Sequence, residues 1–146
     1  ILSYPLEYVD YFLLNEVEAS DICGIEATKD PQALMNGLVK QFPEAKIVLT
    51  LGGDGSVVLD STSATPIQRI APVHVNAVDT TGAGDAFWGG FLHRMLALDK
   101  TPDQLTVDDA ADCARWGSAT AAVCVTRRGA IPAMPSLAEA EALLAE

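Results

Sequence analysis

The sequence is short of positive charge. Lysine and arginine together account for 9 of the 146 residues, against 20 aspartates and glutamates, so the formal net charge is −11. This balance does not favour binding to the phosphate backbone of nucleic acids, and we expect no nucleic-acid partner. Any ligand with several negative charges must therefore be held by local geometry.

Cysteine is also scarce, and long apolar runs are lacking. The odd number of cysteines (Cys23, Cys113 and Cys124) and the absence of CxxC spacing argue against a disulfide framework and a zinc site. No apolar run reaches the roughly 18 residues of a membrane-spanning helix, and residues 1–5 show neither a basic region nor a small-residue cleavage site. We therefore expect a cytoplasmic protein with reduced cysteines and no membrane partner.

Apolar residues make up 49% of the chain, enough for a single domain of this length to bury a sizeable core. Nearly continuous apolar runs alternate with helical patterns, which predicts an α/β fold of three layers, αβα, with a short antiparallel excursion. The expected strands and extended stretches cover residues 8–14, 46–51, 56–59, 67–70 and 73–78. The expected helices cover residues 16–22, 31–42, 84–98, 107–123 and a segment that begins at Ser136. Because the segment 84–98 has apolar residues on almost every side, we expect this helix to be enclosed by its neighbours.

The most informative segment reads DTTGAGDAF and covers residues 79–87. Gly82 and Gly84 would bring backbone N–H groups close to a ligand at a helix N-terminus, where the dipole favours negative charge. Asp85 falls in the first turn, within reach of that anion, and is suited to act as a general base in phosphoryl transfer. A simple capping carboxylate with turn-forming glycines is the structural alternative.

This segment resembles the DTxGAGD signature of the ribokinase-like (PfkB-type) sugar kinases. The resemblance implies that Asp85 deprotonates the sugar hydroxyl and that the Gly82–Gly84 amides form the anion hole. It also implies that Asp79, with Thr81, helps to bind a monovalent cation, expected to be K⁺, beside the nucleotide.

Two earlier segments resemble further landmarks of that family. Asn15 and Glu18 match an NxxE element that organises Mg²⁺, water and phosphate; a helix cap with a solvated glutamate is the alternative. Thr50 and Gly52 lie in TLGGDG, which resembles the family's nucleotide segment and also reads as a tight hairpin turn, and we expect both to hold. On the helix expected at 107–123, the small residues Gly117, Ala119, Ala121 and Ala122 would leave space for adenine, although tight helix packing explains them equally well.

The segment CVTRRGA, residues 124–130, resembles the family loop whose carbonyls complete the cation site. The matching carbonyls are those of Cys124, Arg127 and Gly129. Family members often place a serine a few residues later, where this chain has Ala133.

The resemblance runs from about residue 8 to residue 146 and corresponds to the second half of a typical family member. We therefore expect residues 1–146 to be the ATP-binding and catalytic C-terminal part of a ribokinase-like kinase domain. The N-terminal half and the β-strand lid, which carry the sugar-binding carboxylate, are not matched. The sheet would then have an unpaired edge. We expect the chain alone to be inactive and the full-length form to be a homodimer.

The function implied is that of a carbohydrate kinase, of ribokinase or fructokinase type, that transfers the γ-phosphate of ATP to a sugar hydroxyl with Mg²⁺. Nucleoside or vitamin substrates remain open within the same superfamily. One alternative is a non-catalytic nucleotide-binding half-domain. Another is a kinase of the NAD or lipid type, which the GGDG at residues 52–55 resembles, but the further motifs of those enzymes are missing.

Overall fold

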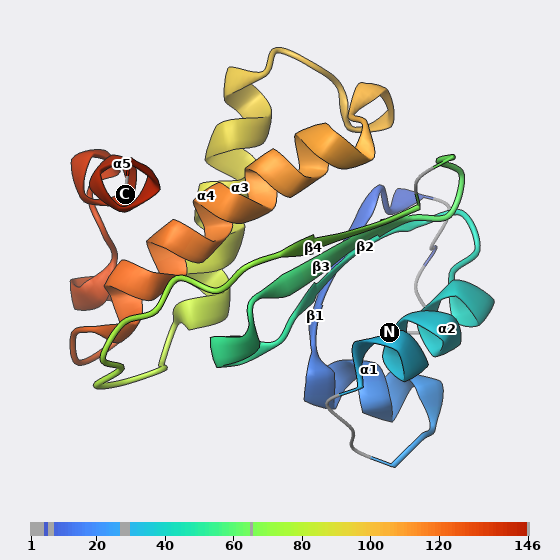
Figure 1. The fold of residues 1–146 in the computed structure, drawn as a ribbon, viewed down its shortest axis with the longest axis horizontal. Coiled ribbons are helices and arrows are strands. Elements are labelled where there is room, and N and C mark those ends of the chain that lie inside the picture. The colour runs from blue at the N-terminus through green and yellow to red at the C-terminus, as the bar shows by residue number, and fades with distance from the viewer. Residues whose placement is uncertain (1–4, 6–7, 27–29, 65, 146) are drawn as a thin grey trace.

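The computed structural model describes residues 5, 8–26, 30–64 and 66–145, so most of the residues inspected for a targeting signal lie outside the described part (Figure 1). Its sheet has the strand order β1-β2-β3-β4. Strand β1 runs parallel to β2, and the pairs β2–β3 and β3–β4 are antiparallel. The strands are β1 (Tyr11–Asn15), β2 (Lys46–Thr50), β3 (Ser56–Asp60) and β4 (Ile67–Ile70).

Helices cover both faces of this sheet, which confirms the three-layer α/β architecture (Figure 1). The helices α1 and α2 lie on one face and α3 and α4 on the other, while α5 packs against α4 away from the sheet. Their bounds are α1 (Glu16–Cys23), α2 (Pro31–Gln41), α3 (Ala83–Ala97), α4 (Val107–Val125) and α5 (Leu137–Leu144), and short 3₁₀ turns cover Gly52–Asp54, Pro102–Gln104 and Ile131–Ala133.

The apolar runs of the strands are buried on both sides because each strand feeds two cores. In β2, Ile47 and Leu49 pack with α1 and α2, whereas Val48 packs with α3 and α4. Successive side chains of a strand point to opposite faces, so one unbroken apolar run supplies both cores. This layering leaves the carboxyl ends of β1 and β2 facing the N-terminus of α3.

Local sequence signals fix the starts of α2, α4 and α5. Asp30 caps α2 by accepting a hydrogen bond from the Gln32 N–H, with Pro31 in the first turn. Ser136 and Glu139 form the expected capping box at α5. A second capping box, at Thr106, starts α4 at the expected residue, Val107.

The structure corrects three of the expected elements. Strand β1 begins at Tyr11 rather than residue 8. Residues 73–78 form no strand; the Val78 N–H donates to the Val125 carbonyl at the end of α4 instead of to a neighbouring strand. Helix α3 is not enclosed all round, since Leu96 near its end is 77% exposed.

The remaining composition-based expectations concern cysteine and membranes. All three cysteines are free. Among the residues that the structure describes, no helix is long and apolar enough to cross a bilayer.

Candidate functional site

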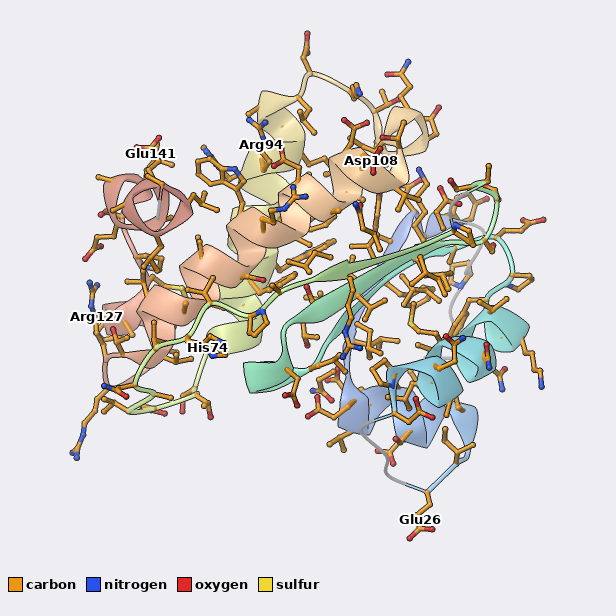
Figure 2. The ribbon with its side chains drawn as sticks, in the orientation of Figure 1. Glu26, His74, Arg94, Asp108, Arg127 and Glu141 are labelled. Carbon is orange, nitrogen blue, oxygen red and sulfur yellow. The ribbon has the colours of Figure 1, made fainter. Side chains whose placement is uncertain are left out.

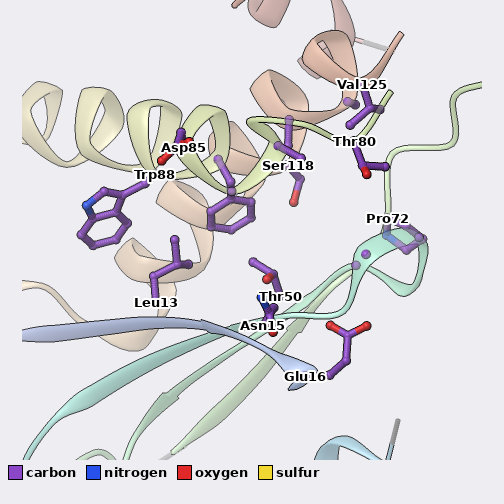
Figure 3. Close-up of a pocket in the computed structure, with 18 of the residues that line it drawn as sticks. Leu13, Asn15, Glu16, Thr50, Pro72, Thr80, Asp85, Trp88, Ser118 and Val125 are labelled. Atoms are coloured by element: carbon purple, nitrogen blue, oxygen red, sulfur yellow. The ribbon is translucent and has the colours of Figure 1, made fainter. Parts of the chain in front are cut away.

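A cleft of about 1030 Å³ lies between the carboxyl ends of β1 and β2 on one side and α3 and α4 on the other (Figure 3). Ligands of open α/β sheets bind beyond the carboxyl ends of the strands, so this is the expected place for a site. Eight residues predicted from the motifs line it: Asn15, Glu18, Thr50, Gly52, Gly82, Ala83, Gly84 and Asp85.

The structure requires a glycine at Gly82, whereas at Gly84 it leaves room for a side chain. Gly82 adopts the left-handed conformation, with φ of 81°, and a Cβ there would lie 2.9 Å from the Cβ of Ala130. A side chain at Gly82 would therefore be both strained and blocked. A Cβ at Gly84 would meet no atom of the described residues within 4 Å, because this residue faces open space at the cleft.

The backbone amides of this turn are not equally available. The Ala83 N–H already donates to the Thr80 carbonyl, at 3.1 Å. Within the described residues, no protein acceptor is found for the N–H groups of Gly84 and Asp85. Of the three amides predicted for the anion hole, that of Ala83 closes the turn, while the Gly82 N–H, like that of Gly84, finds no protein acceptor among the described residues.

Asp85 lies in the first turn of α3, and its side chain is exposed at the cleft (Figure 3). Within the described part of the chain, its carboxylate has no hydrogen-bond or ion-pair partner. Trp88, one turn later, also lines the cleft and stacks on Phe91. The carboxylate is thus free to bind a ligand.

Asp79 joins two segments that are far apart in the sequence. Its Oδ2 accepts a hydrogen bond from the Gly129 N–H at 2.8 Å. Its Oδ1 accepts hydrogen bonds from the Thr81 N–H at 3.0 Å and the Thr81 hydroxyl at 2.7 Å. These hydrogen bonds favour the charged form of Asp79 and lower its pKa to about 2, and the one from Gly129 has the largest effect.

The loop that follows α4 closes against the same motif, behind the cleft. The Cys124 thiol lies 3.9 Å from the Thr81 carbonyl, and burial raises the pKa of that thiol. The Arg127 N–H donates to the Cys124 carbonyl at 3.2 Å. The structure thus brings together the five residues predicted for the cation site: Asp79, Thr81, Cys124, Arg127 and Gly129.

Asn15 and Glu18 form a capping box at the start of α1. The Asn15 Oδ1 accepts hydrogen bonds from the N–H groups of Val17 and Glu18, and the Glu18 Oε2 accepts one from the Asn15 N–H. The capping role that the sequence left open is therefore present, and both residues also line the cleft. The other Glu18 oxygen, Oε1, has no hydrogen-bond partner among the described residues.

Of the residues predicted to contact the nucleotide, Thr50 and Gly52 lie at the cleft and Gly117 does not. Thr50 and Gly52 border the cleft, and residues 52–54 form the turn between β2 and β3, as both readings required. Gly117 does not line the cleft; a Cβ there would lie 2.8 Å from the Phe87 carbonyl. The helix-packing explanation of Gly117 is therefore the one the structure shows.

One face of α4 borders the cleft. Ala121 and Ala122, two of the small residues expected to leave space for adenine, line it, and so do Ser118 and Val125, which the sequence did not single out (Figure 3). Their spacing of i, i+3, i+4 and i+7 marks one face of a helix, which is the signal that could have found them. His74 also borders the cleft.

Comparison with known proteins decides the family. The model for "pfkB family carbohydrate kinase" matches residues 2–137. The chain belongs to the pfkB family of carbohydrate kinases. It is 33% identical to a ribokinase from Staphylococcus aureus over 135 residues, which are 92% of this chain and 41% of the relative. It is 42% identical to fructokinase-2 from Solanum lycopersicum over 139 residues, 92% of this chain and 39% of the relative.

Solved structures of pfkB-type sugar kinases share this fold. A ribokinase from Giardia lamblia matches with a TM-score of 0.80 at 32% identity, over 93% of this chain and 43% of that one. A fructokinase double mutant from Vibrio cholerae, with fructose, ADP and potassium bound, matches with a TM-score of 0.76 at 27% identity, over 92% and 40%. The chain thus spans about 40% of the length of these pfkB-family relatives.

Proposed function

We propose that the full-length gene product is a sugar kinase of ribokinase or fructokinase type that transfers the γ-phosphate of ATP to a sugar hydroxyl. The observation that carries this proposal is the Asp85 carboxylate beside the N–H groups of Gly84 and Asp85 at the mouth of the cleft, all without a hydrogen-bond partner among the described residues. In this proposal residues 1–146 are the ATP-binding and catalytic C-terminal part of the kinase domain. Homodimerisation and a cytoplasmic location remain predictions.

Asp85 would take the proton from the sugar hydroxyl that attacks the phosphorus. A carboxylate without a partner among the described residues can accept this proton, and its position next to the proposed anion-binding amides would bring base, nucleophile and phosphoryl group together. The amides of Gly84 and Asp85, with the α3 dipole behind them, would stabilise the negative charge on the phosphoryl oxygens in transit.

The strand-end residues of the cleft would hold the nucleotide. Thr50 and Gly52 would contact the phosphates through hydroxyl and backbone groups, while the α4 face at residues 118–125 offers small side chains to the remainder of the ATP. The free Glu18 Oε1 and the neighbouring Asn15 are oxygen ligands of the kind that Mg²⁺ or its bound water uses. Mg²⁺ would neutralise charge on the phosphates.

The donors around Asp79 fit a monovalent cation. They are oxygens only: the Asp79 carboxylate and the carbonyls of Thr81, Cys124, Arg127 and Gly129, the chemistry by which proteins replace the hydration shell of K⁺. In the described part of the chain, no group of three or more His, Cys, Asp or Glu side chains could hold a metal ion, so carbonyls would have to complete this site. The potassium ion of the Vibrio cholerae fructokinase structure supports the assignment.

A non-catalytic nucleotide-binding module is the second candidate, because the chain spans only about 40% of its relatives. The two are separated by measuring ADP release from ATP and Mg²⁺ with ribose, fructose and other sugars, on the full-length gene product and on residues 1–146. Sugar-dependent ADP release by the full-length protein supports the kinase. ATP binding without sugar-dependent release in the full-length protein favours the binding module.

A further inference from the structure

An ion pair ties the loop after α4 to helix α5. The Arg127 guanidinium contacts the Glu139 Oε1 in the first turn of α5. The other oxygen of Glu139, Oε2, accepts hydrogen bonds from the N–H and the hydroxyl of Ser136, each at 2.8 Å. The carboxylate that meets Arg127 is therefore fixed to the helix rather than free to rotate.

The same loop also contacts the glycine-rich motif. Gly129, in the left-handed conformation with φ of 84°, donates its N–H to the Asp79 Oδ2. Only Arg128 lies between Arg127 and Gly129, so the guanidinium and the amide hold the same short turn from opposite ends. A continuous chain of contacts runs from Glu139 through this turn to Asp79. Arg127 lies at the end of the molecule where α4 finishes (Figure 2).

We propose that the Arg127–Glu139 ion pair positions the loop of residues 126–130 against Asp79 and thereby sets the affinity of the monovalent-cation site. This inference rests on the proposed function for that site. The two side chains are 39% and 40% exposed, so their pairing adds little to global stability. Its effect would be local, on the loop carbonyls, and Glu139 acts as a positioning residue that touches no ligand.

The variant Glu139→Gln separates positioning from helix capping. Glutamine can still accept the Ser136 hydrogen bonds, as capping boxes use either residue, but it lacks the charge that holds Arg127. Glu141→Gln is the matched control, because it removes the same charge from an exposed position of the same helix (Figure 2). Arg127→Met removes the other partner and leaves the backbone carbonyl.

The first measurement is the potassium concentration for half-maximal sugar-dependent ADP release by the full-length gene product. We expect Glu139→Gln and Arg127→Met each to raise it about two- to fivefold, the range of a partly exposed ion pair. The double variant should add little to either single change, because both remove one interaction. In Glu139→Gln, kcat at saturating potassium should be unchanged, and Glu141→Gln should match wild type throughout.

The second measurement is hydrogen exchange of the Gly129 amide in potassium-free buffer, which reports the loop without any bound ion. We expect faster exchange in Glu139→Gln than in Glu141→Gln. A wild-type enzyme that needs potassium, with Glu139→Gln unchanged in potassium dependence or in exchange, overturns the inference and leaves the proposed function standing. A full-length protein without sugar-dependent ADP release, or one indifferent to potassium, overturns the cation assignment and this inference with it.

Discussion

Asp85 is the residue whose replacement tests the chemistry most directly. Replacing it with asparagine removes the base and keeps the size of the side chain, so kcat of the full-length gene product should fall by about 10²–10⁴-fold. ATP binding should be nearly unchanged, because the amides of Gly84 and Asp85 remain. Steady-state kinetics and calorimetric ATP titration measure the two effects.

Asp108→Asn is the control for this substitution. Asp108 also lies in the first turn of a helix, α4, and is exposed, but it does not border the cleft (Figure 2). The Asp108→Asn variant therefore shows the effect of losing a carboxylate at a helix N-terminus when no catalytic base is lost. An Asp85→Asn enzyme that keeps more than about a tenth of wild-type kcat would remove Asp85 from the catalytic role.

Asp79 should make stability depend on pH. Its pKa of about 2 lies below the usual 3.8, so its stabilisation is complete above the usual value and is lost as the pH falls from 3.8 towards 2. Asp79→Asn should therefore lower Tm at pH 7, with the gap to wild type narrowing as the pH drops below about 4. Thermal unfolding of both proteins from pH 7 to pH 3 measures the difference in Tm. A difference that stays constant over this range would show that the charge of Asp79 is not what stabilises the loop.

The residues of the site were predictable where the signal is local, and unpredictable where it depends on distant contacts. The spacing of Gly82, Gly84 and Asp85 indicates an anion site directly. The use of the Ala83 N–H by Thr80 depends on the turn conformation, and the Gly129–Asp79 hydrogen bond joins residues 50 positions apart. Periodicity and spacing carry no information about such pairs.

At the scale of the element, two adjacent glycines of α3 should respond oppositely to alanine. A Cβ at Gly90 would lie 2.4 Å from the Thr120 Oγ1 and 2.7 Å from the Trp116 carbonyl, so Gly90→Ala should destabilise the protein by about 1–3 kcal/mol. A Cβ at Gly89 would meet no atom in the described part of the chain within 4 Å, and Gly89→Ala should stabilise the protein by about 0.5–1 kcal/mol because it lowers the backbone entropy of the unfolded chain. Urea unfolding of both variants measures the difference.

Gly89→Ala serves as the control for Gly90→Ala, since both make the same chemical change in the same turn. Equal effects on the unfolding free energy would contradict the close α3–α4 crossing. The crossing is also where the Thr120 hydroxyl donates to the Ala86 carbonyl at 2.7 Å. Loss of this contact is one reason to expect a large effect at Gly90.

Elements with their own start and stop signals were predicted well, as the caps at Asp30 and Ser136 show. Residues 73–78 were not, because a valine-rich stretch becomes a strand only beside a partner, and here Val78 finds its partner at the end of α4. The enclosure of α3 was also predicted wrongly. An apolar residue such as Leu96 marks a possible contact without showing that a neighbour is there.

At the scale of the whole molecule, we expect residues 1–146 alone to phosphorylate no sugar at a useful rate. The proposed base and anion site lie in this chain, but about 60% of the length of its relatives is not covered by it. Holding the acceptor hydroxyl in place contributes about 7–11 kcal/mol to such reactions, and an open cleft lets water compete. Sugar phosphate above background, with turnover near the roughly 1 s⁻¹ of slower kinases, would show that this chain is catalytically complete.

Strand β1 also bears on how readily the protein aggregates. It is an edge strand of the described sheet, and its sequence YFLLN has no charge and no proline, a composition prone to intermolecular strand addition. Asp10 and Glu16 flank it directly and act as gatekeepers, since like charges repel a second copy that approaches in register. Low pH or high salt should weaken this protection and bring these edges together as β-rich aggregates.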